Sequence, residues 1–144
     1  MIGELNREQM ERVLHSEVIG RIGCHAEGKT YVVPITYVFD GDSIYGHSAE
    51  GLKLQMMRKN PKVCFEVDHL ENLANWQSVI AWGEFEELKG LEAQAGMQKL
   101  VHRLMPLMSS ETAQPTHGQN PAGGGQASIY RIRLEEMTGR FEKR

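Results

Sequence analysis

The sequence predicts an α+β protein, mainly β, whose strands form an antiparallel sheet or barrel. Six segments show the alternating or continuous apolar pattern of strands, and three carry apolar residues at helical spacing. Turn signals at glycine separate several of these strands by only a few residues, which favours hairpins. No βαβ alternation occurs, so the order of elements argues against a Rossmann or P-loop enzyme.

Three helices are predicted from local signals. Asn6 and Gln9 fit a capping box, because each side chain can bond the backbone amide of the other residue. Ser48 is the candidate N-cap of the second helix, and an Asn-Pro pair ends that helix. The third helix shows apolar residues at helical spacing over most of its length. The predicted helices span residues 6–16, 49–59 and 89–108.

Six strands are predicted around these helices. They span residues 18–24, 30–39, 43–47, 62–68, 76–86 and 127–134. Glu27-Gly28 predicts a turn, and Asp40-Gly41 predicts a tight hairpin, because glycine tolerates the positive φ that such turns require. Gly83 marks a candidate bulge within the fifth strand.

The chain is expected to form one domain over residues 1–144, with a polar interruption at residues 109–126. That segment is rich in Ser, Thr, Gln, Pro and Gly, and it buries too little apolar surface to offset the entropy of ordering. We therefore predict a flexible loop there. A mobile lid is the one functional interpretation that it supports.

Composition and charge argue against several classes of function. The formal net charge of −3 and a pI near 6.1 give no electrostatic basis for binding nucleic acid. No segment approaches the length of a membrane span, and the N-terminal residues lack the apolar core of a signal peptide. Two cysteines cannot form a disulfide scaffold. We expect a cytoplasmic protein with reduced thiols.

Residues 45–53 predict a candidate anion site where a strand passes into a helix. The first turn of a helix presents unpaired amides and the positive end of the helix dipole. His47, Ser48 and Lys53 add donors around that point, and Gly51 lets a ligand approach the backbone. A capped helix with an exposed lysine explains the same residues and is favoured on local signal alone.

Pro34 lies inside an apolar strand, although a residue without a backbone donor belongs at a sheet edge or beside a disruption. The backbone groups of Val33, Ile35 and Thr36 are then free to bond another partner. A flat heterocycle with several acceptors and an imide donor would fit them. A plain edge strand without a ligand is the simpler alternative.

Trp76 and Trp82 stand at even spacing in one predicted strand and therefore point to the same face. They are candidates for the core or for a subunit contact, ahead of a cofactor stack. The six histidines show no HExxH or other metal-ligand spacing, and no GxSxG nucleophile elbow occurs. No metal site and no acid–base dyad is predicted.

Taken in order, several segments resemble the flavin-binding split-barrel superfamily typified by pyridoxamine 5′-phosphate oxidase. Within it, they are most similar to the smaller nitroimidazole-resistance-like branch. The resemblance covers about residues 5–142 and is carried by the ordered set rather than by one motif. Its segments are Gly20–Gly23, Val32–Tyr37, Tyr45–Lys53, Asn60–Val63, Trp76–Gly83, Ile129–Ile132 and Thr138–Arg140.

This resemblance implies a six-stranded antiparallel split β-barrel with flanking helices. It also implies a homodimer with FMN bound at the subunit interface. The residues whose backbone would line the isoalloxazine ring are Val33, Pro34, Ile35 and Thr36. The edge-strand argument from the proline supports that assignment independently.

The same resemblance assigns residues to the other parts of the flavin. His47, Ser48 and Lys53 would surround the phosphate and the ribityl chain. His47 also matches a histidine near the flavin in the nitroimidazole-resistance branch. It is the candidate catalytic residue, because an imidazole beside the ring can donate a hydrogen bond or a proton. The residues that would complete the pocket near the ribityl chain or phosphate are Trp76, Ser78 and Val79.

The function that the resemblance implies is an FMN-dependent, nitroreductase-like oxidoreductase acting on a small organic acceptor. NAD(P)H is a candidate electron donor that no motif specifies. Alternatives are a non-catalytic flavin-binding or redox-sensing module, a haem- or F420-binding member of the same fold, and a structural dimer without ligand. Two departures argue against oxidation of vitamin B6. Leu52 stands where the oxidases have an arginine, and the chain lacks their C-terminal Arg-Leu-x-Pro element.

Overall fold

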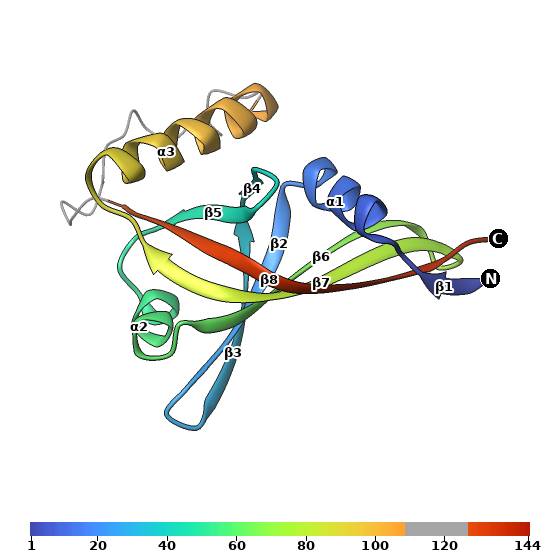
Figure 1. The fold of residues 1–144 in the computed structure, drawn as a ribbon, viewed down its shortest axis with the longest axis horizontal. Coiled ribbons are helices and arrows are strands. Elements are labelled where there is room, and N and C mark those ends of the chain that lie inside the picture. The colour runs from blue at the N-terminus through green and yellow to red at the C-terminus, as the bar shows by residue number, and fades with distance from the viewer. Residues whose placement is uncertain (109–126) are drawn as a thin grey trace.

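Eight strands and three α-helices make up residues 1–108 and 127–144, the part of the chain that the computed structural model describes (Figure 1). The strands are β1 (Ile2–Glu4), β2 (Ile19–Ala26), β3 (Lys29–Thr36), β4 (Val38–Phe39), β5 (Ser43–Ser48), β6 (Lys62–Asn72), β7 (Asn75–Glu87) and β8 (Ser128–Glu142). The helices are α1 (Arg7–Ser16), α2 (Leu52–Lys59) and α3 (Gly90–Leu104), with a 3-10 turn η1 (Met105–Leu107) after α3. The predicted flexible loop 109–126 lies outside the described residues.

The strands form one antiparallel sheet in the order β3-β2-β6-β7-β8-β5-β4, and β1 pairs with β8 outside this path. Helices α1 and α3 lie on the same side of the long β7–β8 ribbon, and α2 lies near the end of the ribbon where β7 finishes (Figure 1). This arrangement confirms the prediction of an α+β, mainly β, antiparallel protein.

The expected six-stranded barrel is wrong in two respects: eight strands are present, and the sheet is open. Its path begins at β3 and ends at β4, and no described strand joins these two ends. β1 is only three residues long and acquires strand geometry by pairing with the end of β8. β4 exists because Tyr37 interrupts the predicted strand 30–39. Its amide donates to the carbonyl of Val18 at 3.0 Å, and its hydroxyl donates to the carbonyl of Leu14 at 2.7 Å.

Two strands extend further than predicted, because pairing continues through polar sequence. β6 runs on through the segment 69–72, which the sequence places in a polar link, and pairs with β7 along its length. β8 continues past residue 134 to Glu142, with β7 as its partner throughout. The β7–β8 register shifts at the predicted position, between Trp82 and Gly83, but the extra residue is Glu135 of β8 and not a residue of β7.

Gly23–Thr30 match in sequence the GxxxxGK(S/T) spacing of a P-loop, although the predicted order of elements argues against a P-loop enzyme. A P-loop requires a strand, a phosphate-binding loop and then a helix. Here the segment covers the end of β2, the turn at Glu27 and Gly28 (φ 51° and 78°), and the start of β3. The match is therefore a hairpin and not a phosphate-binding loop.

The main core lies between the inner face of the sheet and the helices α1 and α2. Its fully buried side chains include Tyr37, Phe65 and Leu54. A smaller cluster around Leu100 packs under α3. α1 begins with the predicted capping box, since Asn6 and Gln9 exchange hydrogen bonds of 2.8 and 2.9 Å. Within residues 1–108 and 127–144, no helix has the length and hydropathy to cross a bilayer.

Candidate functional site

The predicted anion site lies at the connection between β5 and α2, but the helix starts later than predicted. α2 begins at Leu52, and its N-cap is Gly51, which supplies no side-chain capping bond. Ser48 is therefore not the cap; its hydroxyl donates to the carbonyl of Ala49 at 2.7 Å. The amides of the first turn of α2 consequently lack the side-chain acceptor that most helix starts carry. An anionic ligand can supply it.

Lys53 lies close enough to His47 to affect the ionisation of the imidazole. The pKa of His47 is lowered chiefly by burial and secondly by the positive charge of Lys53. The pKa of Lys53 is lowered by burial. Solvent still reaches the imidazole, which keeps the position open to a ligand. We refer to His47, Ser48, Lys53 and the first-turn amides of α2 as the α2 donor cluster.

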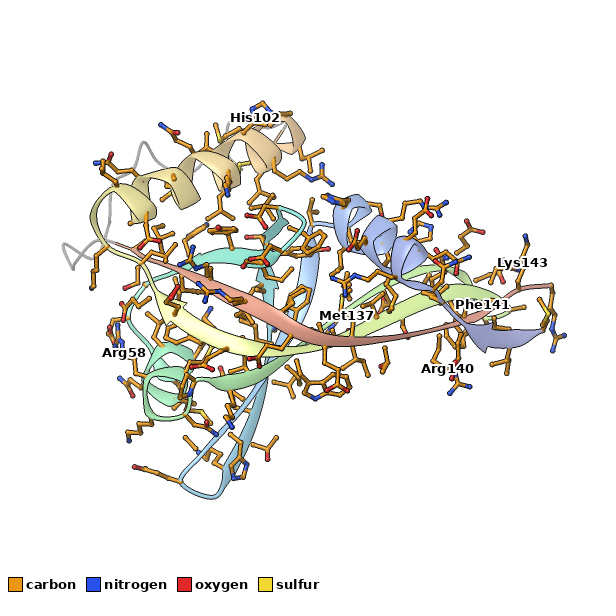
Figure 2. The ribbon with its side chains drawn as sticks, in the orientation of Figure 1. Arg58, His102, Met137, Arg140, Phe141 and Lys143 are labelled. Carbon is orange, nitrogen blue, oxygen red and sulfur yellow. The ribbon has the colours of Figure 1, made fainter. Side chains whose placement is uncertain are left out.

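The loop before α2 is held in place by an arginine from the same helix. Arg58, which Figure 2 labels beside α2, donates to both carboxylate oxygens of Glu87, each at 2.9 Å, and to those of Glu50 at 2.7 and 3.0 Å. The hydrogen bonds from Arg58 lower the pKa of Glu87 to about 2. Because Glu87 ends β7, this network fixes residues 49–51 against the sheet and positions the α2 donor cluster.

Pro34 lies on an edge strand, as predicted. β3 is the first strand of the sheet path and pairs only with β2 among the described strands. The side chains of Val33 and Ile35 turn toward the core, whereas Pro34 and Thr36 are exposed. The free side of β3 therefore offers backbone groups, not apolar side chains, to a ligand.

This edge belongs to the same half of the sheet as the α2 donor cluster. Lys53 is near enough to the thiol of Cys24, on β2, for the two groups to influence each other's pKa. Cys24 pairs with Tyr31 on β3, and Pro34 is three residues further along that strand, about 10 Å at the usual rise. One ligand of moderate length can contact both.

The remaining predicted residues lie at the opposite end of the sheet. Trp76 pairs with Glu142 at the start of β7, and Val79 is buried in the core. Ser78 and Glu87 are nine residues apart on β7, which corresponds to about 30 Å. Since Glu87 contacts α2 through Arg58, one chain does not bring Trp76 or Ser78 to the α2 donor cluster.

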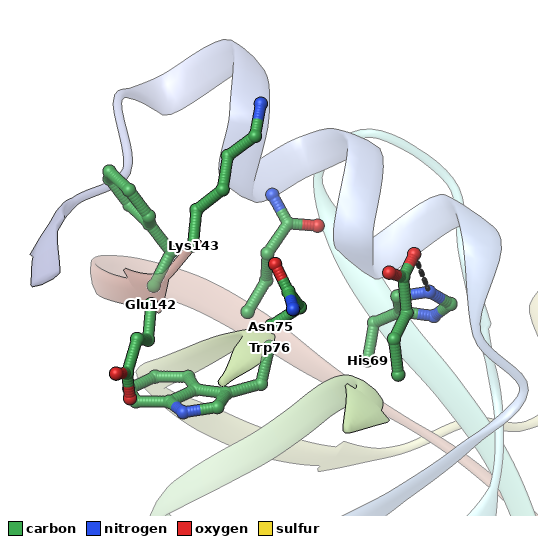
Figure 3. Close-up of a pocket in the computed structure, with 8 residues that line it drawn as sticks. His69, Asn75, Trp76, Glu142 and Lys143 are labelled. Carbon is green, nitrogen blue, oxygen red and sulfur yellow. Dashed lines mark ion pairs between the residues drawn. The ribbon is translucent and has the colours of Figure 1, made fainter. Parts of the chain in front are cut away.

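The start of β7 has a polar hollow of its own. It encloses about 170 Å³ and is lined by side chains that include Trp76, Asn75 and Lys143 (Figure 3). His69 stands at its margin, where Glu17 at 3.0 Å and Glu71 at 3.6 Å raise its pKa. Within the described residues no group of three or more metal-ligating side chains gathers, here or elsewhere.

Sequence reasoning missed a surface on the face of the sheet opposite α1. Cys64 and Trp82 pair directly across β6 and β7 and line a shallow groove there of about 450 Å³ with Val32. A Cβ at Gly23 would lie 2.7 Å from the sulfur of Cys64, so the glycine leaves room for that thiol. Period-2 alternation indicates which residues share a face, but the strand order that gathers them is non-local.

Comparison with known proteins decides the family. The sequence profile described as pyridoxamine 5′-phosphate oxidase matches residues 6–141. This chain belongs to that family. A protein of Rhizobium meliloti (strain 1021), uncharacterized protein RA0666, is 29% identical over 141 residues, which cover 94% of this chain and 92% of the relative.

Solved structures share the fold of this family member. An FAD-binding protein of Mesorhizobium loti superposes with a TM-score of 0.82 at 25% identity, covering 100% of this chain and 98% of the other. A candidate 5-nitroimidazole antibiotic resistance protein of Bacteroides thetaiotaomicron gives a TM-score of 0.73 at 18% identity, covering 98% and 87%. The predicted family resemblance is thereby confirmed.

Proposed function

We propose that this chain is a flavin-binding protein that holds FMN in a homodimer and acts as a flavin-dependent oxidoreductase on a small organic acceptor. The observation that carries the proposal is the α2 donor cluster, where Lys53 and His47 stand beside a helix start without a side-chain cap. Such a donor set fits a terminal phosphate. Family membership supports the same conclusion.

The residues toward the phosphate are Lys53, Ser48 and the first-turn amides of α2. Ser48 must give up its bond to Ala49 to donate to a ligand. The residues toward the ring are the edge-strand segment Val33–Thr36, whose outward backbone groups suit a flat heterocycle with donors and acceptors. Leu52, where the oxidases have an arginine, is 43% exposed in the first turn and leaves Lys53 as the main fixed charge.

Flavin, when bound, supplies the hydride and electron transfer. This chain positions the flavin, controls access to it and supplies one group that can carry a proton, His47. Because its pKa is lowered, His47 is neutral near pH 7 and can donate or accept a hydrogen bond without adding charge. NAD(P)H is the proposed electron donor.

A second copy of the chain is proposed to complete the site. Trp76 and Ser78 stand near the start of β7, with Ser78 about 30 Å along the strand from Glu87, the residue through which Arg58 of α2 contacts β7. If these residues contact the flavin at all, they must come from a partner. Val79 supports the core and offers no side chain to a ligand.

Two alternatives rest on the same pocket. A flavin carrier or sensor would bind the cofactor without turnover. Because the Mesorhizobium loti protein is named as FAD-binding, FAD should be tested as a ligand beside FMN. Haem and the deazaflavin F420 remain alternatives with distinct spectra.

The test is a visible spectrum of the purified protein with mass identification of what copurifies, followed by titration with FMN, FAD and riboflavin. We expect a flavin spectrum and tighter binding of FMN than of riboflavin. Bleaching by NAD(P)H and recovery with a nitroaromatic acceptor support the enzyme; bound flavin that stays oxidised supports the carrier. A protein that binds no flavin at any concentration would falsify the proposal.

A further inference from the structure

Among the described residues, one buried polar side chain has no hydrogen-bond partner, that of Tyr130 on β8. The residue is 1% exposed, and its hydroxyl oxygen makes no hydrogen bond. Tyr37 is buried as deeply, yet its hydroxyl donates to the carbonyl of Leu14 at 2.7 Å. A buried hydroxyl without a partner destabilises a fold, whereas phenylalanine fills almost the same volume without that penalty. The stability of the described fold therefore does not explain the hydroxyl of Tyr130.

The phenol of Tyr130 leans from β8 across to β5. Tyr130 pairs with Gly46, and a Cβ on that glycine would lie 2.5 Å from the hydroxyl oxygen and 2.6 Å from the ring carbon Cζ. Cβ atoms do not approach other atoms so closely, so the phenol takes the place of a side chain at position 46. The hydroxyl consequently lies at the strand that continues into His47 and Ser48 of the α2 donor cluster.

β5 is an edge strand at the point where the phenol meets it. β4 pairs with β5 only at Ile44 and Tyr45. From Gly46 to Ser48, β5 pairs with β8 alone among the described strands. The other side of this segment carries no neighbouring strand, and the segment leads directly to the α2 donor cluster. A ligand along this edge would lie next to the backbone that the phenol reaches.

The hydroxyl of Tyr130 is a neutral group in a fixed position. Burial raises the pKa of Tyr130, so the phenol keeps its proton at every ordinary pH. Phe85 packs edge-on against the ring, with the two centroids 5.6 Å apart, and holds it in place. A neutral partner such as an alcohol suits this position, because an anion buried there without a cation would lose its hydration uncompensated.

We propose that the hydroxyl of Tyr130 is a binding group of the flavin site, and that its partner is a hydroxyl of the ribityl chain. This rests on the proposed function, in which the phosphate occupies the α2 donor cluster. The ribityl chain is the neutral, hydroxyl-bearing part of the flavin that directly follows the phosphate.

The contact between Tyr130 and the ribityl chain forms only in the bound state. No solvent reaches the hydroxyl in the free chain, so binding has to displace what covers it. Ser48, which shares a face of β5 with Gly46, must exchange its own bond to Ala49 in the same event. The bound flavin then supplies the hydrogen bond that the buried phenol lacks in the free chain.

The experiment compares Tyr130→Phe with the wild-type full chain in two measurements. Thermal unfolding without flavin should show an equal or higher midpoint for the variant, because the unpartnered hydroxyl is gone and the ring remains. Fluorescence titration should show FMN and riboflavin binding about threefold to tenfold more weakly, the effect of one neutral hydrogen bond. Lumiflavin has the same ring without the ribityl chain, and its affinity should not change.

Tyr37→Phe is the matched control, because it removes the same atom from a second fully buried tyrosine. That hydroxyl bonds the carbonyl of Leu14 in the last turn of α1. The control variant should unfold at a lower temperature and bind all three flavins with wild-type affinity. The two variants thus separate a hydroxyl that stabilises the fold from one that binds the ligand.

Three results would overturn the inference. Wild-type affinity of Tyr130→Phe for FMN and riboflavin would mean that the hydroxyl does not contact the ligand. A lower unfolding temperature of Tyr130→Phe without flavin would mean that the hydroxyl already bonds a buried water or another group of the fold. An equal loss of lumiflavin affinity would move the contact to the ring. Each leaves the proposed function intact, whereas a wild-type chain that binds no flavin removes the function and the inference together.

Discussion

The two ends of β7 differ in how they are built, and the difference shows what kind of site each can form. At the far end, Glu87 joins the Arg58 network, and the α2 donor cluster stands on a fixed loop. At the start, Trp76 lies in an open polar hollow lined by the end of β6, the start of β7, the end of β8 and Lys143. The first end is the proposed anion site, and its loop is already held in place. The second end offers an aromatic surface that would join the proposed site only beside a second copy of the chain.

The strongest test of this contrast is Lys53→Ala. Losing the main fixed cation of a partly buried phosphate site costs about 2 kcal/mol or more, so FMN affinity should fall about 30-fold. Fluorescence titration measures it. Lys59→Ala, on the same helix but paired with Glu27 at the surface, is the control and should bind FMN normally. Unchanged affinity in Lys53→Ala would remove this residue from the site.

Trp76→Ala tests whether the two ends serve one ligand. We expect FMN affinity to fall about tenfold, because an aromatic contact contributes about 0.5–1.5 kcal/mol beyond the area it buries. Mixing this variant with Lys53→Ala sharpens the result. In mixed dimers one site combines the intact Lys53 with the intact Trp76 of the other copy, so about a quarter of all sites should recover. If no sites recover, either Lys53 and Trp76 of the same chain belong to one site, or Trp76 belongs to no flavin site.

The pH dependence of FMN binding should show whether His47 of the α2 donor cluster lies beside the phosphate. A phosphate raises the pKa of His47 above its depressed free value. Binding is then strongest below the free pKa and weakens by up to about tenfold per pH unit as pH rises toward the bound one. Isothermal titration should show this slope for FMN, less of it in His47→Gln, and none for riboflavin, which lacks the phosphate. An equal slope with riboflavin contradicts the assignment.

The smallest expected effect is that of Arg58→Ala, which removes the anchor of the loop 49–51 without touching the ligand. FMN affinity should fall about twofold to fivefold, since exposed ion pairs contribute little individually. Arg7→Ala removes an equal charge from an i,i+4 pair on α1 and serves as the control. An Arg58→Ala loss as large as that of Lys53→Ala would make Arg58 a direct ligand contact.

Local signals predicted much of the fold. The capping box at Asn6 and the turn at Asp40-Gly41 depend on residues a few positions apart, and Asp40 accepts the amides of Asp42 and Ser43 as such turns require. Non-local pairing was the harder part. The second half of β8 is polar on its outward side, and only its pairing with β7 reveals it as a strand.

The candidate site was predictable in part for the same reason. His47 and Lys53 are near in sequence, and the strand-to-helix passage brings them together. Trp76 and Ser78 carry a family pattern, but nothing in a linear sequence says that they lie at the other end of a thirteen-residue strand. The groove lined by Val32, Cys64 and Trp82 was likewise hidden, because it collects single residues from strands that are distant along the chain.

The turn between β2 and β3 has a practical consequence for anyone sorting genomes by short patterns. A search for the Walker spacing would place this chain among nucleoside triphosphate hydrolases on the strength of Gly23–Thr30. Two consecutive residues in left-handed conformation reverse the backbone there, and Lys29 opens a strand instead of a helix. Lys29 therefore does not follow a phosphate-binding loop of backbone amides, and incubation with ATP and magnesium should yield no hydrolysis.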